Sequence, residues 1–529
     1  MNGGTSMYDA IVVGGGHNGL VAAVLLARAG QAVLVLERGE AVGGAAVSIA
    51  PFAGRDARLS RYSYLVSLFP QPLLDELGVG VELRARRVSS YTPCDDAGVL
   101  VSEDAAASAA SVRRTLGSDA AVAQLAAFGE LTGRLAARTF GSLTEPLRTR
   151  DEFAALVDDD DAWHGVFEAP LGQLIDRSFG DDLVRGIVAT DALIGTFAAL
   201  DDPGLVQNRC FLYHVIGRGT GRWDVPIGGM GALTTALGRI AADAGAELRT
   251  GSPVRAIDTD GRSAEVRTAD GDAYRARHVL AALSPTVLAD LAPGVLTDSV
   301  TGAARPEGSQ LKLNLLLAHL PRLRDPHVRP EDAFAGTFHV NESAGQLDTA
   351  FHEASRGQIP QLPPCEAYCH SLTDPSILGA GLRSEGAQTL TVFGLHMPAR
   401  LFADDPVAAK REAVAATLRS LNSVLAEPIE ECLLDDANGE PCLEARTPVE
   451  LEHELAMPGG HIFHRDLSWP FAETDAEVGG WGVQTAAPNV WLAGAGARRG
   501  GGVSGIPGFA ATRAVLAARD MVGRSTSRS

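Results

Sequence analysis

The stretch that decides the fold is Tyr8–Ala46, YDAIVVGGGHNGLVAAVLLARAGQAVLVLERGEAVGGAA. Residues 8–13 form a short, β-rich apolar run, as buried parallel strands do. Residues 20–29 have helical spacing and end at Gly30, and residues 32–37 form a second apolar run. This order predicts a strand–helix–strand unit in an α/β domain.

The turn after the first predicted strand carries a G-x-G-x-x-G motif made by Gly14, Gly16 and Gly19. The first glycine permits a tight turn, the second lets the backbone approach a pyrophosphate, and the third lets helix and strand pack closely. The helix that follows offers free N–H groups and a partial positive charge to phosphates. We therefore predict a dinucleotide site that includes His17 and Asn18 at the variable positions.

The residues after the second strand indicate which dinucleotide binds. Glu37 ends that strand, where a carboxylate accepts from ribose hydroxyls and would repel the 2′-phosphate of NADP. Arg38 follows, and then the run Gly43, Gly44 and Ala45. This arrangement resembles the extended fingerprint of FAD oxidoreductases, in which the second glycine pair lies along the pyrophosphate and ribityl chain. The predicted cofactor is FAD.

Later segments complete a discontinuous FAD domain. Residues 245–285 read as a β-meander with Asp-Gly turns at 260–261 and 270–271. Val254 in this meander resembles the valine whose backbone meets adenine in this superfamily. Residues 489–492 form a strand before Gly494 and Ala495, and a glycine run then precedes a helix to about residue 520. We expect the N-terminus of that helix, with Val503 and Ser504, to face the flavin pyrimidine ring.

Several motifs resemble those of one family. The segments 8–46, WDVPIGGMG at 223–231 and 494–508 are similar to the phytoene-desaturase-related FAD oxidoreductases, within the amine-oxidase-like superfamily. The similarity is greatest to the branch of pyridine nucleotide-disulfide oxidoreductase domain-containing protein 2. The resemblance implies a discontinuous Rossmann-type FAD-binding domain plus an α+β substrate domain with a mixed sheet and helices.

The domain boundaries follow from these motifs. We predict that residues 1–95, 225–300 and 455–529 form the FAD-binding domain, and that 96–224 and 301–454 form the substrate domain. Residues 102–200 have helical spacing, residues 309–400 alternate as strands do, and residues 405–426 form an amphipathic helix.

Three residues are candidates for catalysis: Lys312, His214 and Arg498. Lys312 resembles the lysine of amine oxidases that holds a water at flavin N5, and a lysine in an apolar strand is costly without partners. The alternative is a strand lysine whose ammonium reaches solvent. His214 is a candidate general base, with a buried structural histidine as its alternative.

Other residues are candidates for the substrate site. Tyr213 and Trp223 are predicted to contact substrate. For Trp223, packing in the hydrophobic core is an equally good interpretation. Arg498 lies beside the C-terminal FAD motif and is a candidate for binding a substrate carboxylate. His461 and His464 flank the same FAD segment and are either catalytic or structural.

Composition excludes several classes of protein. The formal net charge of −20 and the pI of about 5.1 argue against nucleic acid as a partner. The six cysteines show no C-x-x-C pair and no metal-ligand spacing, so neither a disulfide reductase nor a metal site is predicted. No signal peptide or apolar run of membrane-spanning length is recognisable, which predicts a cytoplasmic protein, monomeric or homodimeric, with peripheral membrane contact left open.

The sequence is compatible with three functions. The first is an FAD-dependent oxidoreductase that desaturates or oxidises a small to medium, largely hydrophobic substrate by hydride transfer to flavin N5. Its electrons would pass to oxygen, a quinone or another carrier. The second is a flavin-dependent isomerase of a polyene-like substrate, without net redox change. The third is a non-catalytic FAD-binding partner protein.

Overall fold

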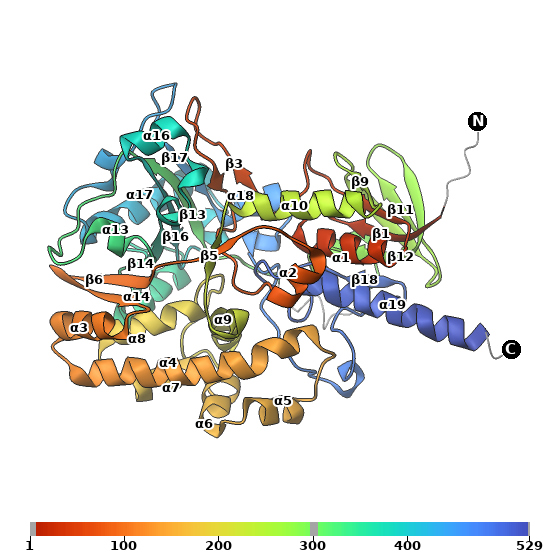
Figure 1. Ribbon diagram of the computed structural model, residues 1–529, viewed down its shortest axis with the longest axis horizontal. Coiled ribbons are helices and arrows are strands. Elements are labelled where there is room, and N and C mark those ends of the chain that lie inside the picture. The colour runs from red at the N-terminus through yellow and green to blue at the C-terminus, as the bar shows by residue number, and fades with distance from the viewer. Residues whose placement is uncertain (1–6, 297–304, 527–529) are drawn as a thin grey trace.

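The computed structural model describes residues 7–296 and 305–526, with side chains of the last helix described to residue 518. The predicted strand–helix–strand unit is present as β1 (Tyr8–Val13), α1 (His17–Arg28) and β2 (Val33–Leu36). Every residue of β2 and ten residues of α1 are buried, because the unit packs inside the first domain. Strand β1 and helix α19, from opposite ends of the described chain, lie at the same end of the molecule (Figure 1).

The first domain is built on a seven-stranded sheet with the order β10-β11-β12-β1-β2-β9, and β18 pairs with β12. β1 runs parallel to β2 and β12, while β10, β11 and β12 form the predicted antiparallel meander. The remaining strands of this sheet are β9 (Glu247–Arg249), β10 (Val254–Thr259), β11 (Ala264–Thr268), β12 (Ala273–Ala281) and β18 (Val490–Leu492). Strands from the middle and the end of the chain thus flank its N-terminal unit.

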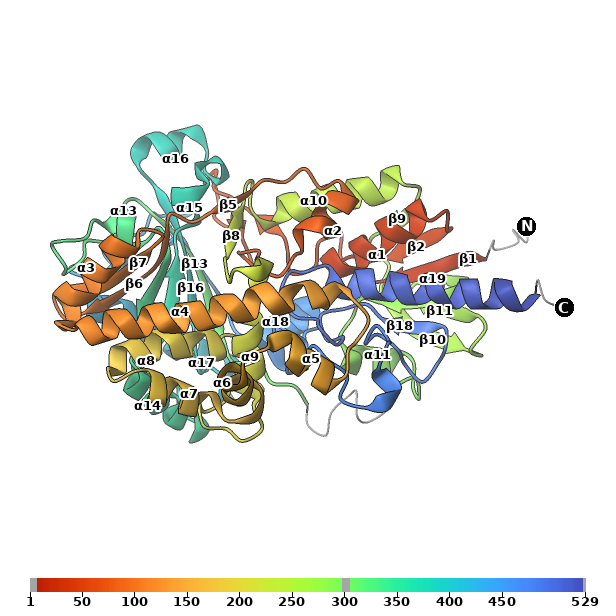
Figure 2. The same cartoon turned by 60° about the horizontal axis from the view of Figure 1, so that its bottom comes forward.

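Helix α1 packs between α10 (Met230–Asp243) and α19 (Ile506–Thr526) (Figure 2). The contact with α19 is close: a Cβ placed on Gly508 would overlap the carbonyl oxygen of Asn18. Because that oxygen belongs to helix backbone, it cannot move away without disturbing α1. A glycine at 508 is therefore what lets the C-terminal helix approach the dinucleotide loop.

The second domain is built on another seven-stranded sheet, with the order β17-β13-β16-β15-β14-β6-β7. Its strands are β6 (Val88–Cys94), β7 (Ala97–Ser102), β13 (Leu311–Leu317), β14 (Thr337–Val340), β15 (Cys365–Tyr368), β16 (Gln388–Gly394) and β17 (Leu443–Arg446). β13, β14 and β15 are buried along their whole length, so this sheet lies inside the domain. In Figure 1 this domain lies to the left and the first to the right.

Helices surround the second sheet. The helical region predicted for residues 102–200 is confirmed, with α3 to α8 in it and α9 directly after it, and the amphipathic helix is α17. Strands β13 to β16 match the alternation expected in 309–400, but helices separate them. The helices are α3 (Ala105–Leu116), α4 (Asp119–Thr139), α5 (Arg150–Val157), α6 (Asp160–Trp163), α7 (Leu171–Ser178), α8 (Asp182–Ala189), α9 (Val206–Val215), α13 (Pro330–Ala333), α14 (Ala344–Ser355), α15 (His370–Thr373), α16 (Ala380–Glu385) and α17 (Pro406–Val424).

Short elements connect the two domains. β5 (Leu83–Ala85) pairs with β8 (Asp224–Pro226), and β3 (Ser48–Ile49) pairs with β4 (Leu59–Ser60). Three further helices lie along these connections and around the first domain: α2 (Gln71–Leu77), α11 (Pro285–Leu291) and α18 (Pro448–Leu455).

The structure corrects two predicted boundaries. β6 begins at Val88 and joins the second sheet, so the first segment of the FAD domain ends before residue 88 rather than at 95. The boundary between 224 and 225 cuts through β8, which pairs across the connection. The boundary between 300 and 301 lies outside the described residues.

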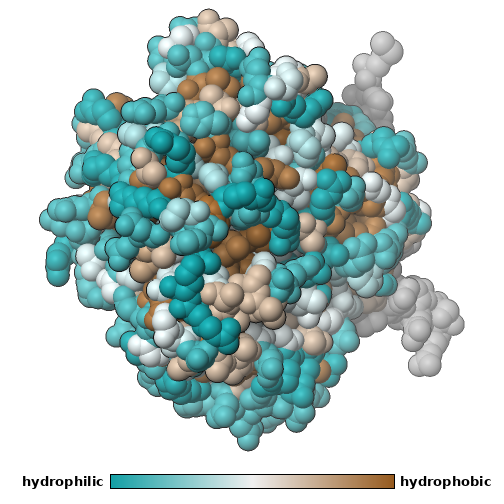
Figure 3. Space-filling view, turned by 60° about the vertical axis from the view of Figure 1, so that its left-hand side comes forward, coloured by the Kyte–Doolittle hydropathy of each residue, from teal (hydrophilic) through white to brown (hydrophobic). Residues whose placement is uncertain are grey.

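Figure 3 shows the face of the molecule on the side of the second domain. Hydrophilic side chains dominate this face, and the hydrophobic ones lie mainly in recesses between them. Large exposed hydrophobic side chains in the described chain are scattered: Met7, Leu362, Val407 and Val478. In the described ranges, no helix combines the length and the apolar character needed to cross a bilayer.

The close approach at Gly508 can be tested by substitution. Gly508→Ala should destabilise the protein by about 1–3 kcal/mol, as overpacking of an interior does, and should reduce FAD retention. Gly381→Ala is the matched control, since a Cβ at this exposed position of α16 meets nothing within 4 Å. Thermal unfolding and flavin content of the two purified variants would check this. Equal behaviour of both would contradict the packing argument.

Candidate active site

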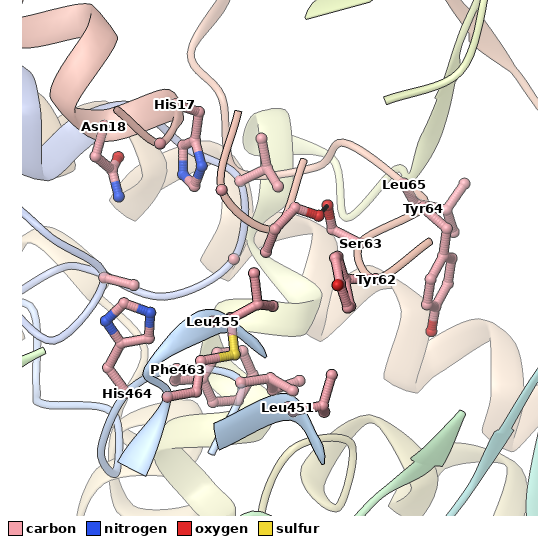
Figure 4. A pocket seen from close by; sticks show the side chains of 18 of the residues that line it. His17, Asn18, Tyr62, Ser63, Tyr64, Leu65, Leu451, Leu455, Phe463 and His464 are labelled. Atoms are coloured by element: carbon pink, nitrogen blue, oxygen red, sulfur yellow. Dashed lines mark hydrogen bonds between the residues drawn. The ribbon is translucent and has the colours of Figure 1, made fainter. Parts of the chain in front are cut away.

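A cavity of about 1310 Å³ runs from the glycine loop of the first domain to the sheet of the second. Ordinary small-molecule pockets occupy about 300–1,000 Å³, so this cavity has room for a cofactor and a second molecule. His17 and Asn18 from α1 lie at one end with His464 opposite them, and Tyr62 and Tyr64 lie farther along (Figure 4). The cavity therefore joins the predicted cofactor site to the predicted substrate site.

The glycine loop presents backbone to this cavity. Gly14, Gly16 and Gly19 all line it. A Cβ on Gly19 would overlap the carbonyl oxygen of Gly14, so only glycine lets α1 start directly above the strand. No side chain caps α1, and no acidic residue occupies its first turn. The first N–H groups of the helix are thus available to an anion.

Two polar atoms beside the loop support a bound ligand. His17 Nε2 and Asn18 Oδ1 are buried, and within the described part of the chain neither has a hydrogen-bond partner. Burial lowers the pKa of His17 to about 4, so its ring is neutral. Buried polar atoms without partners are costly unless something satisfies them. A polar cofactor lying along the loop would satisfy both.

Glu37 fixes the rim of the loop. Its two carboxylate oxygens accept from the amides of Gly15, at 2.8 Å, and Gly39, at 2.7 Å, and the side chain lines the cavity. Arg38 also lines the cavity and donates to the carbonyl oxygen of Glu454. Gly44 and Ala45 line it as well, while Gly43 lies just behind and donates its N–H to Gly15 O at 2.9 Å.

The later segments reach the same cavity. Val254 from β10, Gly494 and Ala495 after β18, and Val503 before α19 all line it. Ser504 does not line it, because its hydroxyl accepts from the amide of Ile506 at the start of α19. The individual contacts of these residues with FAD stay predictions.

Lys312 lies in the wall of the cavity on β13, and its side chain is almost completely buried. Its Nζ donates to the carbonyl oxygens of Ser60, at 2.9 Å, and Tyr62, at 2.5 Å. Burial lowers the pKa of Lys312 well below its usual value. The amine does not reach solvent, so the structure rules out the snorkelling alternative. With two carbonyl partners fixing its direction, Nζ can also contact a water that lies in the cavity.

His214 and Trp223 also line the cavity. Their rings stack with centroids 5.2 Å apart, and the Trp223 indole N–H donates to the carbonyl oxygen of His214. His214 Nδ1 lies 2.8 Å from the carbonyl oxygen of Cys210, and burial lowers the pKa of the ring. A neutral imidazole that donates from Nδ1 keeps Nε2 free of a proton. The position of His214 thus suits a general base.

Two predicted substrate residues lie elsewhere. Tyr213 packs in the hydrophobic core around α9, and its hydroxyl donates to Ser468 O at 3.0 Å. Arg498 pairs with Glu473, at 2.6 Å, and with Glu477, at 2.5 Å. Neither side chain lines the cavity, so both predictions were wrong about position. The arginine is neutralised by the two glutamates and is not available to a substrate carboxylate.

The structure adds a group of buried and half-buried polar residues that the sequence did not indicate. At the far end of the cavity lie Tyr64, Arg86, Asp191, His339, Glu366 and Tyr368. Burial, reinforced by the charge of Glu342, raises the pKa of Glu366 to about 8. Burial alone would lower the pKa of His339, but Glu342 and Glu366 raise it to about 9. In the sequence, this group could have been recognised from His339 and Glu366, which are polar residues inside the otherwise apolar strands TFHV and CEAY.

Comparisons with known proteins agree with this geometry. The model of the flavin-containing amine oxidoreductase family matches residues 71–315, and that of the NAD(P)-binding Rossmann-like domain matches residues 12–74. An uncharacterized protein of Mycobacterium tuberculosis is 49% identical over 530 residues, covering 96% of this chain and 97% of its own. The mouse pyridine nucleotide-disulfide oxidoreductase domain-containing protein 2 is 30% identical, covering 96% of this chain and 93% of its own.

The chain belongs to the same family as pyridine nucleotide-disulfide oxidoreductase domain-containing protein 2, among the flavin-containing amine oxidoreductases. Its cofactor is FAD, which supplies a two-electron acceptor when bound. A hydroxyneurosporene desaturase of Cereibacter sphaeroides is 25% identical over 97% of this chain and 98% of its own. The fold also matches a solved variant of putrescine oxidase, with a TM-score of 0.59, 18% identity and coverage of 98% and 99%. The predicted family, fold class and cofactor are confirmed.

The oxidoreductase should depend on Glu37 to retain its flavin. Glu37→Ala leaves the amides of Gly15 and Gly39 without their charged acceptor, and such hydrogen bonds contribute about 1.5–3 kcal/mol each. We expect FAD to dissociate at least about 10-fold more readily, measured as flavin released per chain on dilution. Glu130→Ala, at an exposed position of α4, is the control. Flavin content equal to that of the control would remove the ribose assignment.

Proposed function

We propose that this oxidoreductase oxidises or desaturates a small to medium, largely hydrophobic organic molecule by hydride transfer to FAD. The observation that carries the proposal is the single cavity shared by the cofactor loop and the second domain. A substrate in the second domain would meet the flavin without leaving the cavity. The hydroxyneurosporene desaturase is named for desaturation of an organic substrate, which supports the same class of reaction.

The walls of the chamber favour an apolar substrate with at least one polar group. Ile194, Phe211, Trp223 and Phe393 contribute apolar and aromatic surface. The polar groups lie together at the end that contains Glu366, and such convergent polar groups orient a ligand in an otherwise apolar site. An organic molecule with a polar end would be held in one direction by this arrangement.

Two residues would handle protons during the oxidation. His214 would accept a proton from substrate through Nε2, because its other nitrogen is held by Cys210 O. Lys312 would hold a water in the cavity wall through Nζ, because both carbonyl partners orient this atom. Electrons would leave the enzyme to oxygen, a quinone or another carrier.

The proposal is tested by an anaerobic screen of organic compounds against the purified holoenzyme. A substrate bleaches the flavin absorbance, and mass spectrometry of the product identifies a loss of two hydrogens or the corresponding oxidation. If no compound bleaches the flavin while the protein retains it, a non-catalytic FAD-binding role gains support. Turnover that requires pre-reduced flavin and consumes no oxidant would favour an isomerase instead.

The role of Lys312 can be tested against a matched control, because the sequence contains one other lysine, Lys410. Lys312→Met should slow flavin reduction by substrate at least about 100-fold, a typical contribution of positioned proton-transfer groups. Lys410→Met is the matched control, because Lys410 lies on α17 and pairs with Glu450 at the surface. The rates come from stopped-flow flavin absorbance. Similar rates in both variants would remove Lys312 from the reaction.

A further inference from the structure

The polar end of the chamber contains a set of side chains that the proposed oxidation does not use. His339 on β14 and Glu366 on β15 are directly paired in the antiparallel register of the second sheet. Directly paired residues project from the same face with Cβ atoms about 4.5–5.5 Å apart. Both side chains line the cavity, although each is more than nine-tenths buried. The sheet itself therefore places an imidazole and a carboxylate side by side.

Glu342 joins this pair through a turn. Asn341 has a φ of 53°, in the left-handed region, and this turn brings Glu342 back to His339 after β14 ends. The Glu342 side chain is completely buried, and its Oε2 accepts from the Thr190 hydroxyl at 2.9 Å and contacts His339 Nδ1. Three residues from two strands and one turn thus converge on one point.

The other oxygen of this carboxylate is the second observation. Glu342 Oε1 is buried and has no hydrogen-bond partner among the residues that the structure describes. A carboxylate oxygen removed from water without a donor is strongly unfavourable. A cation bound at this point would compensate the oxygen directly, as no described side-chain donor does.

The donor atoms have the spacing of a ligand set. One nitrogen or oxygen from each of His339, Glu342 and Glu366 lies within 4.8 Å of the others. Imidazole and carboxylate ligands bind Zn²⁺ at about 2.0–2.2 Å, so small side-chain rotations would bring all three around one ion. Three protein ligands with a further open position is the arrangement of catalytic rather than structural zinc sites.

The surrounding charges favour a divalent ion over a monovalent one. Asp191 is a third carboxylate within electrostatic reach of Glu342 and Glu366, and Arg86 is the guanidinium that interacts with Asp191 and Glu366. Binding of a metal ion would displace the protons that the raised pKa values of His339 and Glu366 retain, and a divalent cation and Arg86 would then balance the three carboxylates.

We propose that His339, Glu342 and Glu366 bind a divalent transition-metal ion, with Zn²⁺ and Mn²⁺ as the best matches to one imidazole and two carboxylates. The open position of the ion faces the chamber that FAD shares. It would bind an oxygen of the substrate, a hydroxyl or a carbonyl, and so hold and polarise the polar end of the molecule.

The chain offers a matched control for the test. A second group, His319, Glu427 and Cys432, also has donor atoms close together, but it lies near the surface. Glu427 already accepts from the amide and guanidinium of Arg322. Glu427→Gln therefore removes a comparable carboxylate without touching the chamber.

The experiment is a titration of chelator-treated holoenzyme with Zn²⁺, and separately with Mn²⁺, by calorimetry. We expect one ion per chain in the wild type and in Glu427→Gln. In Glu342→Gln and His339→Ala the affinity should fall at least about 100-fold, because loss of an outer partner alone weakens metal sites about 10–100-fold. FAD content of each variant shows that the fold is retained.

Absence of stoichiometric binding of either ion by the wild type would overturn the proposal. Equal affinity of Glu342→Gln and the wild type would do the same. If a chamber variant loses its FAD, X-ray absorption of the zinc-loaded wild type identifies the ligands of the ion. Imidazole nitrogen and carboxylate oxygen ligands would support the proposed site, and a sulfur ligand would contradict it. None of these measurements needs a substrate, so failure here leaves the proposed oxidation standing, and failure of the oxidation leaves this site standing.

Discussion

The cofactor site depends on one close contact, the packing of α1 between the glycine loop below it and α19 beside it. Gly19 lets α1 start against the backbone of Gly14, and Gly508 lets α19 approach the carbonyl of Asn18. Both contacts are backbone to backbone, so neither can be relieved by a side chain that rotates away. Segments almost five hundred residues apart in the sequence meet at the dinucleotide loop for this reason.

This contact also bears on where the proposed reaction would take place. The cavity extends from the glycine loop, past the segment after β18, to the second domain. There β13 supplies Lys312, and β14 and β15 supply His339 and Glu366. The chamber is thus apolar along its walls and ionisable at its far end, an arrangement that would separate the proposed hydride transfer from recognition of a polar group.

The sequence was sufficient for the parts of the molecule that local patterns determine. Strand, glycine loop, helix and terminal Glu37 are contiguous, and each element has its own periodicity or turn signal, so the dinucleotide unit was predicted with its residues. Side-chain direction on α9 was not predictable in this way. His214 faces the cavity while its neighbour Tyr213 packs into the core, and only the rotation of the helix decides between them.

Nonlocal contacts explain the remaining differences. Arg498 stands beside the C-terminal FAD motif, but Glu473 and Glu477 fold back onto it from a loop whose path no periodicity indicates. The group of His339, Glu342 and Glu366 depends on the register between β14 and β15 and on one left-handed residue. Metal-ligand spacing along the chain was absent, because the spacing here exists only across strands.

The central claim is that both ends of the chain assemble one site that binds FAD. The most direct measurement is the flavin stoichiometry of the purified protein, from its visible absorbance and from the cofactor released on denaturation and identified by chromatography. The account predicts one FAD per chain, with FMN and NAD(P) absent. A colourless protein that releases no flavin, and that takes up none when FAD is added, would contradict it.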